Sequence, residues 1–279
     1  MMLSKISKKF NLNQKFLFAV PYLLVALFLI VLPVVLIVIN SLRSNEGNNP
    51  WTLVGQPGTW KIIWRSLYVG VISALLCLII ALPYSYFISR SQSKIFQIYA
   101  LSLIISPMAI FTIARIYAIK GLFLSIFASE PNTLNNSWFI ILGLTYLNLP
   151  LMIMPLYTVF KDMPKNIIEA SNDLGYNDFQ TLFKVILPYG TKAILSGLGM
   201  IFLAGATTFT ISSKLLPDGS QQTLIGDLIN TKINPGNKYD LQVGSTLVIV
   251  VSAIFIGSYS LLLLIPKVIF KFKKGYHYE

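Results

Sequence analysis

The sequence predicts an all-α integral membrane protein with six transmembrane helices, and three observations support this fold class. First, 55% of the 279 residues are hydrophobic and only 11% are charged, whereas soluble domains average about 25% charged residues. Second, charge-free stretches long enough to cross a bilayer core of about 30 Å occur six times. Third, these stretches are continuously apolar, which argues against the alternating pattern of a transmembrane β-barrel.

The six predicted spans form one transmembrane domain, residues 16–266. They cover about residues 16–39, 66–89, 95–120, 138–160, 193–213 and 241–266. The first is longer than the apolar core of a signal peptide, roughly 7–15 residues, and no cleavage pattern of small residues follows it. The third has a short charge-free run and is expected to continue through Arg115 to about Lys120. The fourth begins after the polar stretch 131–137, which is expected to be a loop.

The distribution of Lys and Arg predicts the orientation of these spans. If the N-terminus is cytoplasmic, the segments 1–15, 90–94, 161–192 and 267–279 are also cytoplasmic, and they hold fourteen of the 22 basic residues. Since basic residues hold short loops in the cytoplasm, both termini are expected there. The segments 41–65, about 121–137 and 214–240, rich in Asn, Gly and Pro, are expected to be surface connections on the opposite side. Residues 1–15 and 267–279 are then basic tails, and the net charge of +12 comes from such flanks. No binding to nucleic acid is expected.

Acidic side chains and nucleotide-binding motifs are both missing from the predicted spans. No Asp or Glu lies within a span as drawn, which disfavours a proton- or sodium-coupled carrier, because such carriers usually place carboxylates in the membrane. No GxxxxGK[ST], GxGxxG or GxSxG motif is found, so no catalytic residue is expected. If transport is powered, the energy must come from a partner on the cytoplasmic side.

Metal and cofactor sites are not expected in this chain. It contains one Cys and one His, which makes an all-protein metal site improbable. Cys77 lies within an apolar run, and His277 lies near the C-terminus. Neither is given a chemical role.

The cytoplasmic stretch 161–192 predicts two short helices between spans four and five. Pro164 suits the first turn of a helix, and Gly175 suits the left-handed position that ends one. Asn177 and Gln180 have the spacing of a capping box at the start of the second helix. Pro188 is expected to mark the bend into the fifth span. The local pattern fits equally a compact knob that another protein binds and a solvated loop that only joins two spans.

One motif in this stretch resembles a known family. Glu169-Ala170-Ser171, Gly175 six residues after the Glu, and Leu187-Pro188 resemble the EAA loop of binding-protein-dependent ABC transporter permeases. In that family the loop forms coupling helices that dock into a cleft of the ATPase subunit. The resemblance therefore implies a coupling role for Glu169, Ala170, Ser171, Asp173, Gly175, Leu187 and Pro188. The one departure is Ser171, a small residue in place of the second Ala.

The resemblance extends over roughly residues 60–265, most specifically to the spermidine/putrescine permease subgroup. It is carried by Ser66–Arg90, Arg115-Ile116-Tyr117-Ala118, the stretch from Tyr146 to Tyr157, and Leu224-Ile225-Gly226. It implies a MetI-like permease fold in the plasma or inner membrane of a prokaryote. The implied partners are a second permease subunit, an ATPase dimer that binds ATP and magnesium, an extracytoplasmic substrate-binding protein and a polyamine substrate. The implied mechanism is alternating access, with no cofactor bound by this chain.

Five polar residues of the spans are candidates for the translocation path: Arg115, Tyr146, Asn148, Thr207 and Thr208. For each, an ordinary role in a hydrogen bond between helices or at the membrane interface stays open. Thr208 stands where the subgroup often has a Glu, so importers of iron, sulfate or phosphonate remain alternatives. An autonomous carrier or channel, and a membrane assembly or scaffold protein, are the competing classes.

Overall fold

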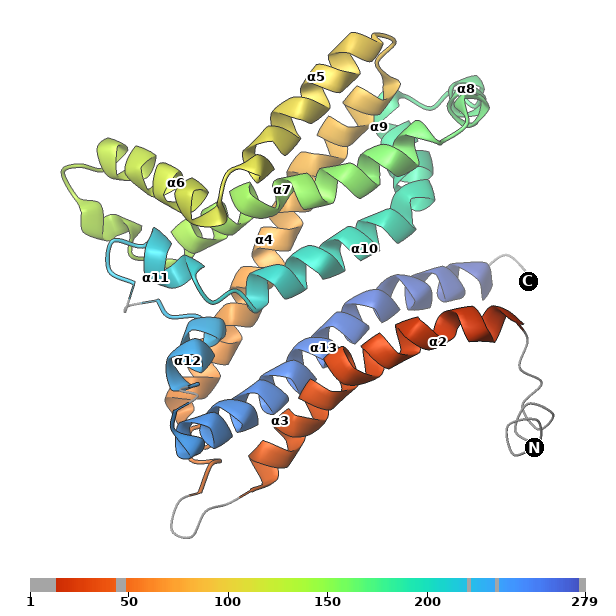
Figure 1. Cartoon of the computed structure of the whole chain (residues 1–279). Coiled ribbons are helices and arrows are strands. Elements are labelled where there is room, and N and C mark those ends of the chain that lie inside the picture. Colours follow the sequence, from red (N-terminus) through yellow and green to blue (C-terminus); the bar gives the residue numbers. More distant parts are fainter. Residues whose placement is uncertain (1–13, 44–48, 220–221, 234–235, 276–279) are drawn as a thin grey trace, which may run out of the picture. The chain divides into compact units, whose positions relative to one another are not determined.

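The computed structural model describes residues 14–43, 49–219, 222–233 and 236–275, and this part of the chain contains helices and connections but no strand. Figure 1 labels the helices along the chain. Their bounds are α2 (Gln14–Ala26), α3 (Leu32–Leu42), α4 (Pro57–Arg90), α5 (Lys94–Ile105), α6 (Thr112–Ile126), α7 (Ser137–Lys161), α8 (Lys165–Asp173), α9 (Asp178–Thr181), α10 (Leu187–Ala206), α11 (Ile211–Leu215), α12 (Ile225–Lys232) and α13 (Lys238–Gly275). Shorter turns are η1 (Leu27–Val31), η2 (Ser106–Ala109), η3 (Pro131–Leu134) and η4 (Leu182–Ile186).

The described residues include five helical stretches that are long and apolar enough to cross a membrane. They are Ala19–Leu42, Pro57–Arg90, Ser137–Lys161, Asp178–Ala206 and Tyr239–Leu264. Each overlaps one of the predicted spans. A sixth candidate consists of two helices joined by a sharp bend, Lys94–Ala109 and Thr112–Ile126. The all-helical membrane fold is therefore confirmed, with five spans or with six if the bent pair crosses as one.

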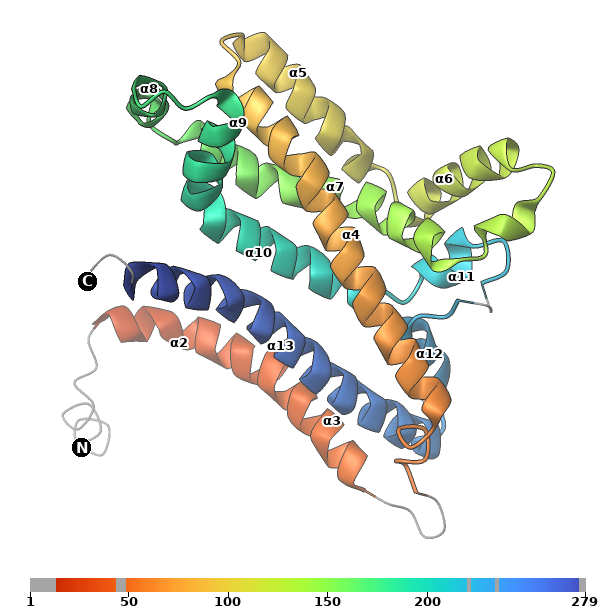
Figure 2. The ribbon, with the colours of Figure 1, turned by 180° about the vertical axis from the view of Figure 1, so that it is seen from behind.

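The bent pair corrects the prediction of one continuous span over residues 95–120. The two helices meet at 103°, and both views show the divergence of α5 and α6 (Figures 1 and 2). Ile110 and Phe111 between them are extended, with ψ angles of 139° and 135°. Pro107, which has no N–H to donate, lies just before the break. A count of apolar residues cannot distinguish a straight helix from one that turns in this way.

Contacts between residues divide the chain into two units, Met1–Gly55 with Lys232–Val250 and Gln56–Thr231 with Val251–Glu279. In the first unit, Thr246 of α13 donates a hydrogen bond of 2.9 Å to the carbonyl of Pro50. The Thr246 side chain is fully buried. This bond ties the connection after α3 to the start of α13.

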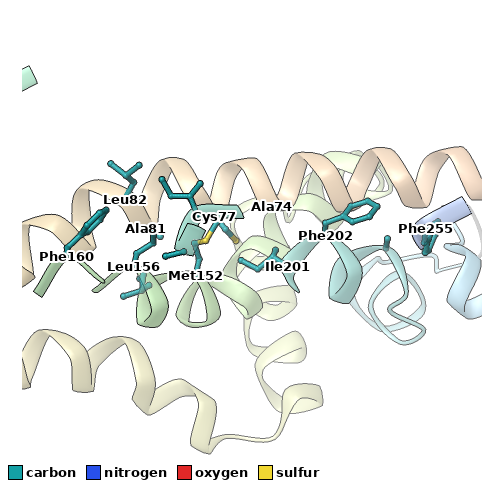
Figure 3. Close-up of a cluster of buried hydrophobic side chains, with 14 of the residues drawn as sticks. Ala74, Cys77, Ala81, Leu82, Met152, Leu156, Phe160, Ile201, Phe202 and Phe255 are labelled. Carbon is teal, nitrogen blue, oxygen red and sulfur yellow. The ribbon is translucent and has the colours of Figure 1, made fainter. Parts of the chain in front are cut away.

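The core of the second unit lies between α4, α7 and α10, which run side by side in Figure 1. Small side chains of α4 allow this helix to approach α7 and α10 closely, as is usual where membrane helices pack. They are Gly70, Ser73, Ala74, Cys77, Ala81 and Ser85, all buried. A Cβ on Gly70 would come within 3.0 Å of the Ala206 Cβ of α10. Figure 3 shows the larger side chains around this stripe, including Met152, Leu156, Phe160, Ile201 and Phe202.

Two π-helical turns precede prolines in the same way. η1 is followed by Pro33 and η4 by Pro188. In each case the residue after the π turn donates its N–H five residues back, Leu32 to Leu27 and Leu187 to Leu182. The wider turn fits a helix that must accommodate a proline without an N–H, one of the known causes of irregular helices. Pro188 therefore lies within the helical stretch Asp178–Ala206 and does not interrupt it.

Candidate functional site

The segment between α7 and α10, residues 162–186, contains the two short helices that the sequence predicts. We call it the α8–α9 segment. Pro164 is the N-cap residue of α8, with extended backbone at φ −58° and ψ 135°. Asn177 caps α9, and both hydrogen bonds of the predicted capping box with Gln180 are present, at 2.8 and 3.2 Å. In Figures 1 and 2, α8 projects beyond the ends of its neighbouring helices in the second unit.

Gly175 ends α8 in the left-handed conformation expected of it, with φ +77°. The N–H of Tyr176 donates to the carbonyl of Ser171 at 3.2 Å, and the N–H of Gly175 donates to Asn172 at 2.8 Å. The bond that reaches back five residues is typical of a Schellman motif. A glycine at this position reverses the chain between α8 and α9 without the steric cost of a side chain.

The structure separates the residues of the predicted coupling motif. Glu169 and Ala170 are exposed, whereas Ser171 is 3% exposed and faces the segment's own interior. Its hydroxyl oxygen lies 2.8 Å from that of Thr181 in α9. Ala170 and Ser171 therefore do not share one exposed face, and Ser171 stabilises the segment from within. Of the remaining predicted residues, Asp173, Gly175 and Pro188 are exposed, and Leu187 is half-buried.

Three large apolar side chains on this segment were not selected by the sequence reading. Leu174, Phe179 and Phe183 are 73%, 70% and 52% exposed. The rings of Phe179 and Phe183 lie side by side, with centroids 4.6 Å apart. Their spacing of four residues in a predicted helix, next to the Gly175 turn, was the available signal. We refer to these three exposed apolar side chains together as the Leu174–Phe183 patch.

The five candidate path residues do not gather at one place. Arg115 is buried in the first turn of α6, where its Nη2 donates to the Thr112 hydroxyl at 3.2 Å. Thr207, at the end of α10, donates its hydroxyl to the Leu203 carbonyl at 2.7 Å. Asn148 is half-buried on α7. Among the described residues no hydrogen bond joins any two of the five candidates.

Tyr146 lines an open groove between α4 and α7 with a volume of about 560 Å³. The groove is mainly apolar and carries aromatic rings from both helices. Its lining residues include Tyr68, Ile72, Leu76, Trp138, Thr145 and Tyr146. Tyr68 and Tyr146 are 49% and 40% exposed, so both residues are accessible at this mainly apolar groove.

Residues 211–219 and 222–232 form a packed and hydrogen-bonded connection, although the sequence predicts a surface connection over residues 214–240. Leu215, Leu216, Leu224 and Ile225 are completely buried. The N–H of Ile225 donates to the Ser66 hydroxyl of α4 at 2.8 Å, and Lys120 of α6 donates to the Leu216 carbonyl at 2.6 Å. The stretch contains two helices of only five and eight residues, which its content of Asn, Gly and Pro does not predict. The prediction of a surface connection is therefore wrong for Leu215, Leu216 and residues 224–227, which are buried.

Asp227 of α12 is the buried carboxylate of this connection. It is 8% exposed and accepts a hydrogen bond from the Ser212 hydroxyl of α11. Burial raises the pKa of Asp227 above its usual range, and the hydrogen bonds from its neighbours offset part of this effect. The carboxylate thus links α12 to α11 within the folded connection.

Comparison with known proteins places the chain among membrane components of transport systems. Residues 75–271 match the family model described as "Binding-protein-dependent transport system inner membrane component". The spermidine/putrescine transport system permease protein PotB homolog of Mycoplasma genitalium is 28% identical over 271 residues, which cover 93% of this chain and 95% of that protein. The spermidine/putrescine transport system permease protein PotB of Escherichia coli is 29% identical over 199 residues, covering 65% of this chain and 70% of that protein.

Two solved structures share the fold. A bacterial ABC transporter involved in the import of the acidic polysaccharide alginate superposes with a TM-score of 0.65 at 18% identity, covering 92% of this chain and 96% of that one. The MetNI methionine ABC transporter in an inward-facing conformation gives a TM-score of 0.56 at 17% identity, covering 75% of this chain and 98% of that one. At these identities the likeness establishes the helical arrangement alone.

Proposed function

The chain belongs to the family of binding-protein-dependent transport system inner membrane components, and we propose that it imports a polyamine in a complex powered by a separate ATPase. Membership makes it a multi-pass permease of an ABC importer in a bacterial plasma membrane. The polyamine assignment is supported by the names of relatives that match as much as 93% of this chain. Spermidine and putrescine are the proposed substrates.

The observation that carries the proposal is the construction of the α8–α9 segment. A short helix ends at the left-handed Gly175 and exposes Glu169 and Ala170 beside the Leu174–Phe183 patch. Exposed apolar surface rimmed by polar groups is typical of a site that binds another protein. The proposed occupant is the cytoplasmic ATPase, with the patch as apolar anchor and Glu169 as polar contact.

The proposed mechanism follows from the continuity between this segment and a membrane span. Asp178–Ala206 is one helical stretch, so a displacement of α9 by the ATPase moves α10 with it. α10 packs against α4 and α7 in the core of the second unit. ATP-driven closure of the ATPase pair then repacks these helices and gives alternating access. ATP and magnesium are bound by the ATPase in this scheme.

The remaining partners of the proposed complex are a second permease subunit and an extracytoplasmic substrate-binding protein. Six spans with both termini in the cytoplasm are the proposed topology, which puts the α8–α9 segment on the ATPase side. Importers of iron, sulfate or phosphonate are the alternative substrate assignment, because Thr208 occupies the position of a carboxylate in the subgroup. The groove beside Tyr146 is a candidate part of the path.

Reconstitution of the complete complex tests the proposal. Proteoliposomes that contain both permeases and the ATPase, supplied with the binding protein, are expected to take up labelled spermidine only when ATP is inside. Unlabelled spermidine and putrescine should compete, whereas iron, sulfate and phosphonate should not. Uptake by this chain alone without ATP would show instead an autonomous carrier, and absence of any uptake by the full complex would favour a scaffold role.

Cysteine cross-linking tests the docking site separately. In a Cys77→Ser background, the variant Phe179→Cys is expected to cross-link to the ATPase. Its thiol should react with an impermeant thiol reagent only from the cytoplasmic side. Gln56→Cys provides the matched control, since Gln56 is also exposed and caps the opposite end of α4. It should react from outside and form no cross-link to the ATPase.

A further inference from the structure

Arg90, the last residue of α4, lies beside the start of the α8–α9 segment. Its Nη1 donates to the carbonyl of Met163 at 3.4 Å, and its guanidinium lies over the ring of Tyr86, 6.0 Å from the centroid. The Met163 side chain is buried, at 3% exposed. The arginine therefore joins the end of α4 to the residues that follow α7.

Two of the three guanidinium nitrogens of Arg90 have no such contact. Nε and Nη2 are buried, and neither has a hydrogen-bond partner among the described residues. Buried donors are nearly always paired, because leaving one unsatisfied costs about 1–3 kcal/mol and more for a charged group. The two free nitrogens lie on one edge of the guanidinium, an edge that suits two parallel hydrogen bonds to a carboxylate.

Asp178 is the carboxylate of α9. It is the first residue of this helix and is exposed. Both views show α9 beside the end of α4 at which Arg90 lies (Figures 1 and 2). In this structure neither Nε nor Nη2 of Arg90 has a hydrogen bond to Asp178.

The helices that meet at this point are those on either side of the α8–α9 segment. The Tyr86 ring packs edge-on against Phe160 of α7, with centroids 6.2 Å apart. Phe160 in turn lies against Gly190 of α10, where a Cβ would come within 2.8 Å of the ring. A shift of α9 is therefore transmitted to Phe160 and to Tyr86, which lies directly beside Arg90.

We propose that Arg90 is a positioning residue for energy coupling, which pairs with Asp178 in one state of the transport cycle. When the ATPase moves α9 toward the end of α4, the carboxylate of Asp178 accepts hydrogen bonds from Nε and Nη2 of Arg90. This ion pair holds the α8–α9 segment on α4 and passes its movement to that span. When the pair opens, Arg90 keeps only its bond to Met163. The inference rests on the proposed coupling function of the segment.

The test is a charge exchange in the reconstituted complex, with uptake per ATP hydrolysed as the readout. Arg90→Gln and Asp178→Asn are each expected to lower this ratio about tenfold while ATP hydrolysis continues. Arg90→Lys should also lower it, because an ammonium group lacks the two-nitrogen edge. The double variant Arg90→Glu with Asp178→Arg should regain much of the lost ratio. Asp162→Asn, which removes another exposed carboxylate of the segment, should leave the ratio unchanged.

A disulfide measurement detects the pairing directly. In a Cys77→Ser background, the double variant Arg90→Cys with Asp178→Cys is expected to form a disulfide between these positions. The rate of its formation should change at least about fivefold between ATP-bound and nucleotide-free complexes. The inference is overturned if the rate is independent of nucleotide, or if the charge exchange is no better than either single variant. Because the Asp178 side chain is exposed, its replacement is expected to leave the fold intact. If the wild-type complex shows no ATP-driven uptake, the proposed function itself fails, whatever the variants do.

Discussion

Ser171 of α8 and Thr181 of α9 are joined by a buried hydrogen bond between hydroxyl oxygens 2.8 Å apart. Their side chains are 3% and 2% exposed. α8 has nine residues and is too short to be stable alone in water, where about 12–15 residues are needed. The α8–α9 segment therefore depends on tertiary contacts of this kind to keep its shape.

Removing one of these hydroxyl groups should loosen the segment. We expect Ser171→Ala to lower the free energy of local opening by about 1–3 kcal/mol, because the Thr181 hydroxyl stays buried without this partner. Hydrogen exchange at the amides of Leu174 and Tyr176, which are bonded within the turn, measures the effect. The double variant Ser171→Ala with Thr181→Val should lose less than Ser171→Ala alone. Ser106→Ala, at an exposed serine of η2, should not change exchange there.

Substitutions at Gly175 should separate the effect of backbone conformation from that of bulk. No atom lies within 4 Å of a Cβ built on Gly175, but its φ of +77° is strained for most side chains. Gly175→Ala is expected to destabilise the segment by about 1 kcal/mol, and Gly175→Asn by less, since Asn tolerates this conformation. Thermal unfolding and uptake per ATP are the measurements.

The variant Gly175→Asp adds a negative charge at the same exposed turn. We expect it to insert normally into the membrane and to uncouple ATP hydrolysis from uptake, because the charge lies beside the Leu174–Phe183 patch. Gly58→Ala is the matched control, with equal free space and no positive φ. Full coupling in Gly175→Asp would contradict the docking role of this turn.

The helical class, the end of α8 and the start of α9 could be predicted because local signals determine them. Apolar length defines a span, and a glycine after a short amphipathic helix marks its end. The bend between α5 and α6 could not be predicted, because the residues at the break, Ile110 and Phe111, are as apolar as the helices around them. The burial of the Ser171 side chain could not be predicted either, because it depends on a hydrogen bond with Thr181, ten residues further along the chain.

The candidate path was the least predictable part. Polar residues of a span were selected by type, but Thr207 donates its hydroxyl within its own helix and Arg115 is buried beside Thr112. Composition does not reveal such internal partners. The folded connection of α11 and α12 was hidden for a related reason: its stability comes from contacts with α4 and α6 and not from helical propensity.

Gly226 of this connection lies against the residues that end α10 and should not tolerate a side chain. A Cβ there would overlap the backbone carbonyls of Thr207 and Thr208. Because backbone atoms cannot rotate away, Gly226→Ala is expected to destabilise the fold by about 1–3 kcal/mol. Thermal unfolding in detergent measures this loss. Gly257→Ala serves as control, since nothing lies within 4 Å of that position in α13; an equal effect of the two changes would contradict the prediction.

The buried carboxylate of Asp227 should give the stability of the α11–α12 connection a pH dependence of known sign. Burial raises the pKa of Asp227 in the folded chain above the ordinary value of 3.8. The folded state therefore binds the proton more tightly than the unfolded state does. The resulting stabilisation is complete below pH 3.8 and is lost as the pH rises through the raised pKa.

We accordingly expect wild-type protein to become more resistant to unfolding as the pH is lowered from 7 toward 5, relative to Asp227→Asn. The Asn side chain is neutral throughout and still offers Ser212 an acceptor, so this part of the pH dependence disappears. The difference between the two unfolding curves isolates Asp227 from the other acidic groups, which both proteins share. Glu130→Gln, at an exposed carboxylate, should follow the wild type at every pH. If Asp227→Asn followed the wild type equally closely, the carboxylate would not be shielded from solvent as the structure places it.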